Sequence, residues 1–241
     1  MKDIFHLSTY LQGGAGRVIC DLIRWQHKFE KKITCVINHK EYSGYQNYKE
    51  HVSELKSLGV LYHVDDWFKR EQDGLSKTAK ELSRIIQERP CDLIHCHASV
   101  PAYVALRVRD NLRSSFPIIQ TMHGWGSNKS AEHELMDLTT MSKLDKVIVV
   151  SQASKQLMLD KGLKEKLLTV IPNGIDPAGQ RKLYSHQEPF WRKPADADIW
   201  IACIGTLCER KNQLVLINAL ALLPEEGPRV YCMLFGDGDG A

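Results

Sequence analysis

A glycine turn followed by two cations lies close to the end of the 241-residue chain. An apolar run over 199–204 leads into Gly205, and the basic pair Arg210 and Lys211 precedes a helical pattern. Unpaired amide N–H groups and the helix dipole favour anions at a helix N-terminus, and nearby cations add to this effect. These residues are therefore candidates for holding a phosphate group, although a solvated helix start would show the same charges.

A second glycine-rich loop, the segment QGGAGR over 12–17, joins the first apolar run to a helical pattern. Glycines there let the backbone approach a ligand closely, whereas the alternative is a tight turn that binds nothing. The spacing fails the dinucleotide fingerprint, because Ile19 stands where the third glycine would be. Asn38 also ends the second apolar run in place of a ribose-binding acid, so a nicotinamide enzyme is disfavoured.

Histidines follow two of the apolar runs. His97 comes directly after the run 93–96, and His123 directly after the run 118–122. A histidine at the end of a strand can hydrogen-bond a sugar hydroxyl or move a proton near neutral pH. The alternative is a structural histidine that bonds to local backbone. The sequence favours His123 as a site residue and places His97 close to the same edge of the sheet.

Cysteine and histidine occur together in the segment 91–97, which raises the question of a metal site. Side chains alternate along a strand, so His95 and His97 share one face while Cys96 points to the other. No second pair of cysteine or histidine stands at a zinc spacing. The sequence therefore predicts neither a bound metal nor a cofactor.

Composition indicates a soluble globular protein, with 43% hydrophobic and 25% charged residues. The net charge of +3 suits an anionic substrate or a weak contact with a membrane surface, but it lacks the clustering typical of nucleic-acid binders. We find no signal-peptide pattern and no run of roughly 18 apolar residues. Seven scattered cysteines favour a reducing compartment, so we expect a cytoplasmic protein, with the inner face of the membrane as an alternative location.

Strand-like and helical patterns alternate along most of the chain. The expected strands cover 4–7, 33–37, 60–64, 93–96, 118–122, 147–150 and 168–171. The first expected helix carries Val18, Ile19, Leu22, Ile23 and Phe29 on one face, and the next ones cover 47–58, 75–88, 102–112, 132–141 and 153–159. This alternation predicts an α/β fold with a doubly wound parallel sheet that helices cover on both faces.

The patterns change after the segment PNGIDP at 172–177, where about twenty residues rich in Pro, Gly, Lys and His show neither period. We therefore expect a first Rossmann-like domain over 1–176, a linker over 177–197 and the beginning of a second Rossmann-like domain over 198–241. The second segment holds only one strand, one helix and another strand, so we expect this domain to be truncated.

Taken in order, these motifs resemble those of the retaining glycosyltransferases of family four. The residues that carry the resemblance are Gly13 to Arg17, Asp92 to His97, Thr121 to Gly124, Val150 and Ser151, Ile171 to Asp176, Ile204 and Gly205, and Arg210 to Asn212. The run Pro-Asn-Gly-Ile-Asp is the most specific of them. The resemblance spans nearly the whole chain and implies the GT-B fold of two Rossmann-like domains.

The resemblance implies transfer of a sugar from a nucleotide-diphosphate donor to an acceptor hydroxyl with retention and without a metal. It implies catalytic roles for His123, Lys211 and Arg210. Donor contacts are implied for Gly13, Gly14, Gly205, Gly236 and Gly238. Acceptor contacts are implied for Arg17 and His97. The acceptor is expected to be a carbohydrate or a lipid-linked glycan of polysaccharide or lipopolysaccharide biosynthesis, and the enzyme a hexosyltransferase.

Two departures from the family pattern shape these expectations. Thr206 stands where many relatives carry an arginine, so Arg210 is a candidate substitute for that cation. The pair of glutamates that grips the donor would lie beyond Ala241, so we expect the 241-residue chain to be an inactive fragment. The alternatives are a noncatalytic domain that binds an acceptor or a partner protein, and an epimerase with the same fold.

Overall fold

A computed structural model describes residues 3–38, 47–64, 72–126, 129–175 and 196–238 of the chain. These residues form two compact units, the first ending at Ile175 and the second containing the residues from 196 onward. Residues 177–195 of the expected linker lie outside the described part of the chain, so the linker remains a prediction.

The described part of the first unit contains a seven-stranded sheet in the order β3-β2-β1-β4-β5-β6-β7. Every neighbouring pair is parallel. The strands are β1 (Asp3–Ser8), β2 (Lys32–Asn38), β3 (Leu61–Val64), β4 (Leu93–Cys96), β5 (Ile118–Met122), β6 (Lys146–Val149) and β7 (Leu168–Val170). The observed order is that of a doubly wound Rossmann-like sheet, which confirms the predicted fold class.

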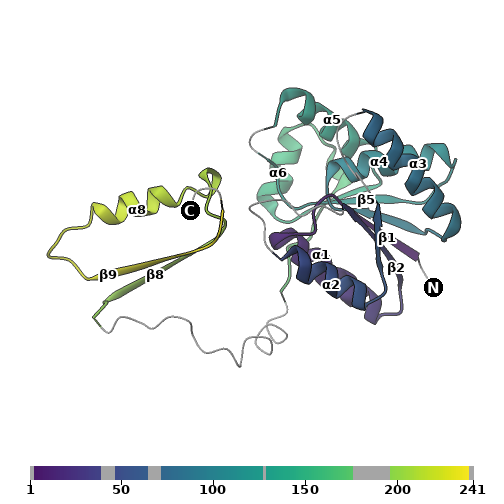
Figure 1. The fold of residues 1–241 in the computed structure, drawn as a ribbon. Helices are drawn as coiled ribbons and strands as arrows, with labels where there is room; N and C mark the ends of the chain where they lie inside the picture. Colours follow the sequence, from purple (N-terminus) through teal and green to yellow (C-terminus); the bar gives the residue numbers. More distant parts are fainter. Residues whose placement is uncertain (1–2, 39–46, 65–71, 127–128, 176–195, 239–241) are drawn as a thin grey trace. The chain divides into compact units, whose positions relative to one another are not determined.

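Helices cover both faces of this sheet (Figure 1). They are α1 (Gly13–Lys28), α2 (Tyr48–Ser57), α3 (Gln72–Glu88), α4 (Ser99–Asn111), α5 (Ala131–Ser142) and α6 (Gln152–Asp160), followed by the short 3-10 helix η1 (Glu165–Leu167). Residues of α1 and α2 pack with β1 and β2 in one apolar core, whereas α3 to α6 contribute to a second core. Parallel crossovers are right-handed, so the reversal of strand order sends the helices to opposite faces.

Side chains alternate between these two cores along β1. Phe5 and Leu7 join the core of α3 to α6, while Ile4 joins the core of α1 and α2. His6 therefore points toward α1, and it lies opposite His95 of β4 in the register of the two strands. Two polar residues are thus buried side by side where the strand order reverses.

One expectation about the first helix was wrong. The sequence pattern placed Phe29 on the buried face, but its side chain is 63% exposed. The helix ends at Lys28, and Phe29 is its C-cap residue, outside the helical period. The ring of Phe29 stacks on Trp25, with centroids 5.9 Å apart, rather than on the core.

The second unit contains one strand-helix-strand motif among its described residues. Strands β8 (Ile199–Ile204) and β9 (Val230–Phe235) are parallel, and α8 (Gln213–Ala221) connects them after the 3-10 helix η2 (Glu209–Lys211). Leu214, Val215 and Leu222 are exposed at α8 and its C-cap, with 59–85% of each side chain accessible. Apolar side chains of this unit therefore remain uncovered by the described residues.

Within the described ranges, no helix is both long and apolar enough to span a bilayer.

Gly16, in the first turn of α1, is packed closely against its neighbours, whereas Gly14 is not. A Cβ atom at Gly16 would lie 2.6 Å from the carbonyl carbon of Leu11 and 2.8 Å from Nδ1 of His51, whereas a Cβ atom at Gly14 would meet nothing within 4 Å. His51 is itself held in place, because its Nδ1 lies 3.1 Å from the carbonyl oxygen of Leu11. Gly16 is therefore required for packing, and Gly14 is not.

We expect Gly16→Ala to destabilise the protein by about 1–3 kcal/mol, since the added methyl group must displace backbone. Gly14→Ala is the matched control, and it should change stability by less than about 1 kcal/mol, in the stabilising direction, because alanine favours a helix. Urea unfolding followed by circular dichroism measures both values. Equal effects of the two substitutions would contradict the packing role of Gly16.

Candidate functional site

A hollow of about 380 Å³ opens at the carboxyl ends of β1, β4 and β5. Its lining consists of Thr9, Tyr10, His97, Ala98, Ser99, Val100, Gln120, Thr121, Met122, His123, Gly124, Trp125, Lys129, Asp137 and Met141. The position is the one where doubly wound sheets bind ligands, because the strand order reverses between β1 and β4. Its volume lies within the roughly 300–1,000 Å³ usual for small-molecule sites. We call this hollow the strand-end pocket.

Four side chains form a hydrogen-bonded row that leads from α1 to the pocket. Gln26 Oε1 lies 2.7 Å from His6 Nε2, and His6 Nδ1 lies 2.9 Å from His97 Nε2. His97 Nδ1 then lies 3.2 Å from His123 Nε2. We call Gln26, His6, His97 and His123 the histidine row. Both ring nitrogens of His6 and of His97 are engaged within it.

His95 lies beside the row on the same face of the sheet. Its ring stacks on that of His97, with centroids 4.4 Å apart, and its Nε2 lies 2.8 Å from Oγ1 of Thr121. His6, His95 and His97 are each at most 6% exposed. Three imidazoles are therefore packed together in the interior, which costs stability unless each one is neutral and hydrogen-bonded.

Burial lowers the pKa of these histidines, because desolvation disfavours the charged form. The pKa of His6 falls to about 4, with the hydrogen bond to Gln26 partly opposing the effect of burial. Desolvation also lowers the pKa of His123 to about 4. For His95 and His97, burial lowers the pKa well below the usual value, and neighbouring histidines add to the shift. The cluster is neutral at physiological pH.

Two polar atoms at the pocket have no hydrogen-bond partner among the described residues. They are Nδ1 of His123 and Oε1 of Gln120, and both are buried. Gln120 is 1% exposed, and its amide nitrogen lies 3.4 Å from the hydroxyl of Ser99. Leaving such atoms unsatisfied costs about 1–3 kcal/mol each. Bound hydroxyl groups would remove this cost, so the pocket is suited to a polyhydroxylated ligand.

A closed ion pair forms another wall of the pocket. Lys129 Nζ lies 2.7 Å from Oδ2 of Asp137, whose side chain is 2% exposed. The same ammonium group lies 3.4 Å from the centre of the Trp125 ring. Asp137 and Trp125 therefore fix Lys129 in position, and the wall presents an aromatic ring beside a neutralised charge.

The expected contacts of the α1 loop are separate from this lining. Gly13, Gly14 and Arg17 do not line the pocket. Gly13 has a φ of 57°, in the region that favours glycine. The guanidinium of Arg17 pairs with Asp21 and with Glu54 of α2. Of the first-unit residues expected at the site, the pocket brings together His97 and His123, and the roles of the other three remain predictions.

His97 reaches the pocket as expected, but not with a free nitrogen. Its two ring nitrogens bond to His6 and His123, so a direct hydrogen bond to an acceptor would break one of these contacts. The expected acceptor-binding role of His97 therefore remains a prediction, and the structure gives this residue a second task.

The loop after β8 in the second unit brings Gly205 and Lys211 together. A Cβ atom at Gly205 would lie 3.9 Å from Cε of Lys211. The described ion pairs of this unit join Arg229 to Asp196 and Asp198, and neither one uses Lys211. The ammonium group of Lys211, just before α8, thus has no ion-pair partner among the described residues and is available for an anion. Arg210 lies in η2, between Glu209 and Lys211.

The two later glycines have a packing role that the sequence did not reveal. A Cβ atom at Gly236 would lie 1.9 Å from the carbonyl oxygen of Gly205, and one at Gly238 would lie 2.3 Å from that of Leu207. The amides of Gly205 and Leu207 also bond to the carbonyls of Phe235 and Asp237. Gly236 and Gly238 let two loops lie against each other, and their expected donor contacts remain predictions.

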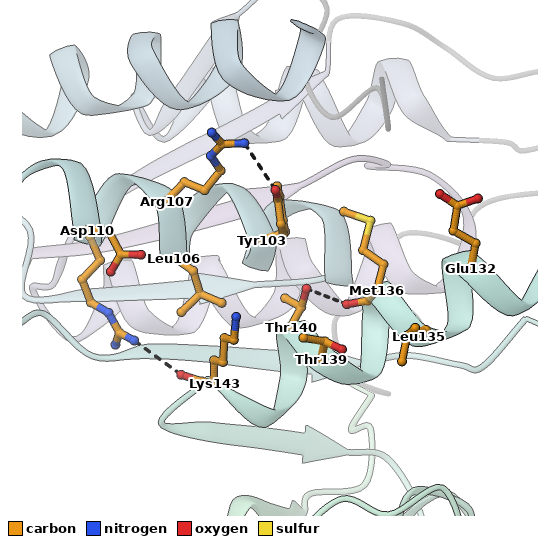
Figure 2. A pocket seen from close by; sticks show the side chains of 11 residues that line it. Tyr103, Leu106, Arg107, Asp110, Glu132, Leu135, Met136, Thr139, Thr140 and Lys143 are labelled. Atoms are coloured by element: carbon orange, nitrogen blue, oxygen red, sulfur yellow. Dashed lines mark hydrogen bonds between the residues drawn. The ribbon is translucent and has the colours of Figure 1, made fainter. Parts of the chain in front are cut away.

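A larger hollow of about 540 Å³ lies between α4 and α5. Figure 2 shows hydrogen bonds within this groove, from Arg107 to the hydroxyl of Tyr103 and from Thr140 to the carbonyl of Met136. Its lining includes none of the expected site residues. We therefore place the candidate site in the smaller strand-end pocket.

The three clustered histidines also raise the question of a metal. One nitrogen from each of His6, His95 and His97 lies within 4.8 Å of the others. The rings of His6 and His97 lie nearly parallel, at 16°, and those of His95 and His97 at 29°. Stacked rings do not converge on a common centre, and the histidine row already uses both nitrogens of His6 and His97. The donor set therefore does not fit a metal ion in this arrangement.

Several residues of the pocket and of the histidine row were not predicted from the sequence. They are Gln120 in β5, His6 in β1, Gln26 in α1, and the pair Lys129 and Asp137. A signal existed for two of them, because His6 and Gln120 are polar residues inside apolar runs that become buried strands. Gln26 and Asp137 lie within helical patterns that gave no comparable signal.

We expect stability to fall as the pH decreases through this histidine cluster. The folded pKa values of His6 and His123 are about 4, below the usual 6.5, so the unfolded chain binds more protons between these two values. The contribution is fully present above about pH 6.5 and is lost toward pH 4. At about pH 5, the free energy of unfolding should be lower than at pH 7.5 by roughly 2 kcal/mol for each of the two residues.

Urea unfolding at the two pH values measures this loss. His123→Asn should reduce the dependence, whereas His133→Asn, at an exposed position of α5, should leave it unchanged. The same free energy of unfolding at both pH values would show that these histidines are not buried in the neutral form.

Solved structures with the same fold include glycosyltransferases. The chain matches Anabaena HepE in complex with UDP-glucose at a TM-score of 0.69 and 19% identity, covering 98% of this chain and 61% of that one. It matches the lipopolysaccharide outer core galactosyltransferase WaaB at a TM-score of 0.67 and 17% identity, covering 99% and 62% of the two chains. The chain thus spans less than two thirds of these neighbours.

An epimerase is a further structural neighbour. The UDP-GlcNAc 2-epimerase of Methanocaldococcus jannaschii gives a TM-score of 0.57 at 13% identity, covering 92% of this chain and 61% of that one. At such identities the likeness establishes a GT-B fold and nothing more specific.

No curated protein matches the sequence at a significant level. The sequence model described as Glycosyltransferase Family 4 matches residues 12–178, which is more than half of the chain and contains most of the strand-end pocket. The chain therefore belongs to glycosyltransferase family 4.

Proposed function

We propose that the protein transfers a sugar from a nucleotide-diphosphate donor to an acceptor hydroxyl, with retention of the anomeric configuration. The observation that carries the proposal is the pair of buried, unpartnered atoms at the strand-end pocket, Nδ1 of His123 and Oε1 of Gln120. Sugar hydroxyls can satisfy both atoms, and Trp125 supplies an aromatic ring beside them. Membership of the glycosyltransferase family supports the same class of ligand.

UDP-glucose is the donor to examine first. The HepE structure with the same fold contains UDP-glucose, and WaaB is a galactosyltransferase, so a hexose from a uridine nucleotide is a reasonable starting ligand. We propose that the transferred sugar binds in the strand-end pocket against His123 and Gln120, with no metal ion required.

The leaving diphosphate needs positive charge as the glycosidic bond breaks. We propose that Lys211 and Arg210 bind it next to Gly205, because Lys211 lies beside Gly205 in the loop before α8. Preorganised cations of this kind stabilise charge that develops in the transition state. Gly13 and Gly14, the first two residues of α1, are proposed as further donor contacts.

The acceptor is proposed to be a carbohydrate or a lipid-linked glycan of the cell surface. WaaB acts in the outer core of lipopolysaccharide, which supports this class without identifying the acceptor. We propose that the protein acts in the cytoplasm or at the inner face of the membrane, and a net charge of +3 is compatible with a weak contact there. Arg17 and His97 remain the proposed acceptor contacts.

Two other functions are separated from transfer by one assay. An epimerase would return an isomerised nucleotide sugar without any acceptor, and a noncatalytic domain would leave the donor unchanged. Incubation with UDP-glucose, followed by chromatography of the nucleotide sugars, distinguishes these outcomes. Because the chain spans 61% of the HepE chain, the assay uses the protein as its native cell produces it.

We expect Lys211→Ala to lower kcat by about a hundredfold or more, as loss of a preorganised charge does in other enzymes. Arg229→Ala is the control, because Arg229 is an exposed cation of the same unit that pairs with Asp196 and Asp198. Its effect should stay within about twofold, as is usual for exposed ion pairs. Equal turnover of Lys211→Ala and the unmodified protein would exclude the proposed role.

We expect His123→Ala to weaken the binding of UDP-glucose by about tenfold, because the substitution removes one hydrogen bond to the sugar. Binding of UDP alone should not change, since UDP lacks the hexose that His123 is proposed to contact. Isothermal titration calorimetry measures both affinities, with the exposed His133→Ala as the control. A parallel loss for UDP and UDP-glucose would place His123 outside the sugar site.

Retention predicts that the product carries the anomeric configuration of the donor. Proton NMR of the product linkage, recorded early in the reaction, reports the configuration directly. An inverted linkage would refute the retaining mechanism while leaving sugar transfer itself intact.

A further inference from the structure

We propose that Gln26, His6 and His97 set the tautomer of His123, so that its Nδ1 presents a lone pair to the strand-end pocket and accepts a hydrogen bond from a substrate hydroxyl. This inference rests on the proposed function for the identity of the ligand. Gln26, His6 and His97 are positioning residues in this scheme, because only His123 would touch the substrate.

In each hydrogen bond of the histidine row, the contacts determine which residue donates and which accepts. We call this donor-to-acceptor order the direction of the row. Gln26 Oε1 can only accept, so His6 donates from Nε2 across 2.7 Å. His6 Nδ1 then accepts from Nε2 of His97 at 2.9 Å, and His97 Nδ1 accepts from Nε2 of His123 at 3.2 Å. His123 is left with Nδ1 as an acceptor, and this is the buried atom without a partner among the described residues.

Neutral rings are needed for this direction to pass along the row. A neutral imidazole has one donor and one acceptor, whereas a protonated ring donates from both nitrogens and ends the sequence. Burial holds the pKa of His6 and His123 near 4 and that of His97 well below its usual value. The hydrogen bond to Gln26 therefore fixes the tautomer of His6, and each neutral ring in turn fixes the tautomer of the next.

The direction of the row determines which ligand groups can bond to Nδ1 of His123. An acceptor at Nδ1 selects a group that carries a proton, such as a sugar hydroxyl, over a carbonyl or carboxylate oxygen at the same place. Oε1 of Gln120 is likewise a buried acceptor at this pocket. The two atoms together favour a ligand that offers two hydroxyl protons. The reverse direction would present an N–H donor at His123 and would favour an oxygen without a proton.

The row also explains why polar residues are buried so deeply. His6 is 0% exposed and is not part of the pocket lining, but it bonds to His97, which is. An apolar residue at position 6 would fill the same space and leave His97 Nε2 without an acceptor. Gln26 is partly exposed on α1, so its amide NH2 can face solvent while its oxygen faces His6.

Nitrogen-15 NMR of histidine-labelled protein tests the proposed direction, because imidazole shifts distinguish a protonated nitrogen from one with a lone pair. We expect His6, His97 and His123 all to carry the proton on Nε2. Single substitutions of the exposed His27 and His133 help to assign the signals. A proton on Nδ1 of His123, or an equal mixture of its tautomers, would overturn the proposal.

Gln26→Met removes the acceptor at the start of the row while keeping the side-chain length. We expect it to give a mixture of tautomers at His123 and to weaken UDP-glucose binding by about threefold to tenfold, as expected for one neutral hydrogen bond. UDP binding should be unchanged. Gln156→Met is the matched control, because Gln156 is an exposed glutamine of α6 that bonds to Asp160. An unchanged tautomer at His123 in Gln26→Met would overturn the positioning role.

The NMR result and the binding result fail separately. The expected tautomers without any binding of UDP-glucose would overturn the proposed function and the assignment of a sugar hydroxyl, but not the direction of the row. Binding of UDP-glucose with the opposite tautomers would overturn the direction of the row but not the proposed function. A metal ion that copurifies in equal amount with the chain, and is lost in His95→Ala, would overturn the row itself, since it would take the lone pairs that the row requires.

Discussion

The hydrogen bond between His6 and His97 holds together the end of the sheet where the site forms. It joins β1 to the residue that follows β4, across the point at which the strand order reverses. A doubly wound sheet opens a crevice there, because the loops on either side leave in opposite directions. The two buried imidazoles are polar groups that need hydrogen-bond partners, and those partners are Gln26 on α1 and His123 at the pocket.

Burial of the histidines carries a free-energy penalty, and it also keeps their rings neutral. Neutral histidines are tolerated in the interior because each nitrogen of His6 and His97 has a hydrogen bond, and desolvation keeps the rings uncharged. Among the described residues around the pocket, the buried atoms without a partner are His123 Nδ1, where the row reaches the pocket, and Gln120 Oε1. The free-energy penalty of unsatisfied buried atoms thus falls at the pocket, where a bound ligand can supply the missing hydrogen bonds.

In the second unit, close packing of two loops positions the backbone around Gly205 and Lys211. Gly236 and Gly238 allow the loop after β9 to lie against the loop after β8, and this contact supports the backbone around Gly205. Lys211 lies beside that backbone and has no carboxylate partner among the described residues. A rigid loop with an available cation suits a diphosphate, just as unpartnered neutral atoms suit hydroxyl groups.

Much of the fold followed from local patterns in the sequence. The alternation of strands and helices predicted the doubly wound sheet, because apolar periodicity and glycine turns act over a few residues. Strand ends also identified His97 and His123, since parallel strands bring their carboxyl ends to one edge. The error at Phe29 arose where the helix ends, because the helical period no longer applies beyond Lys28.

The histidine row was decided only by the tertiary structure. Gln26, His6, His97 and His123 come from four separate segments, and no local pattern relates an amide on α1 to an imidazole after β5. The packing role of Gly236 and Gly238 is likewise a matter of two loops meeting. The sequence by itself determined which elements form and which residues stand at their ends. Which of those residues share hydrogen bonds depended on strand order and helix packing, because such contacts join positions that are distant along the chain.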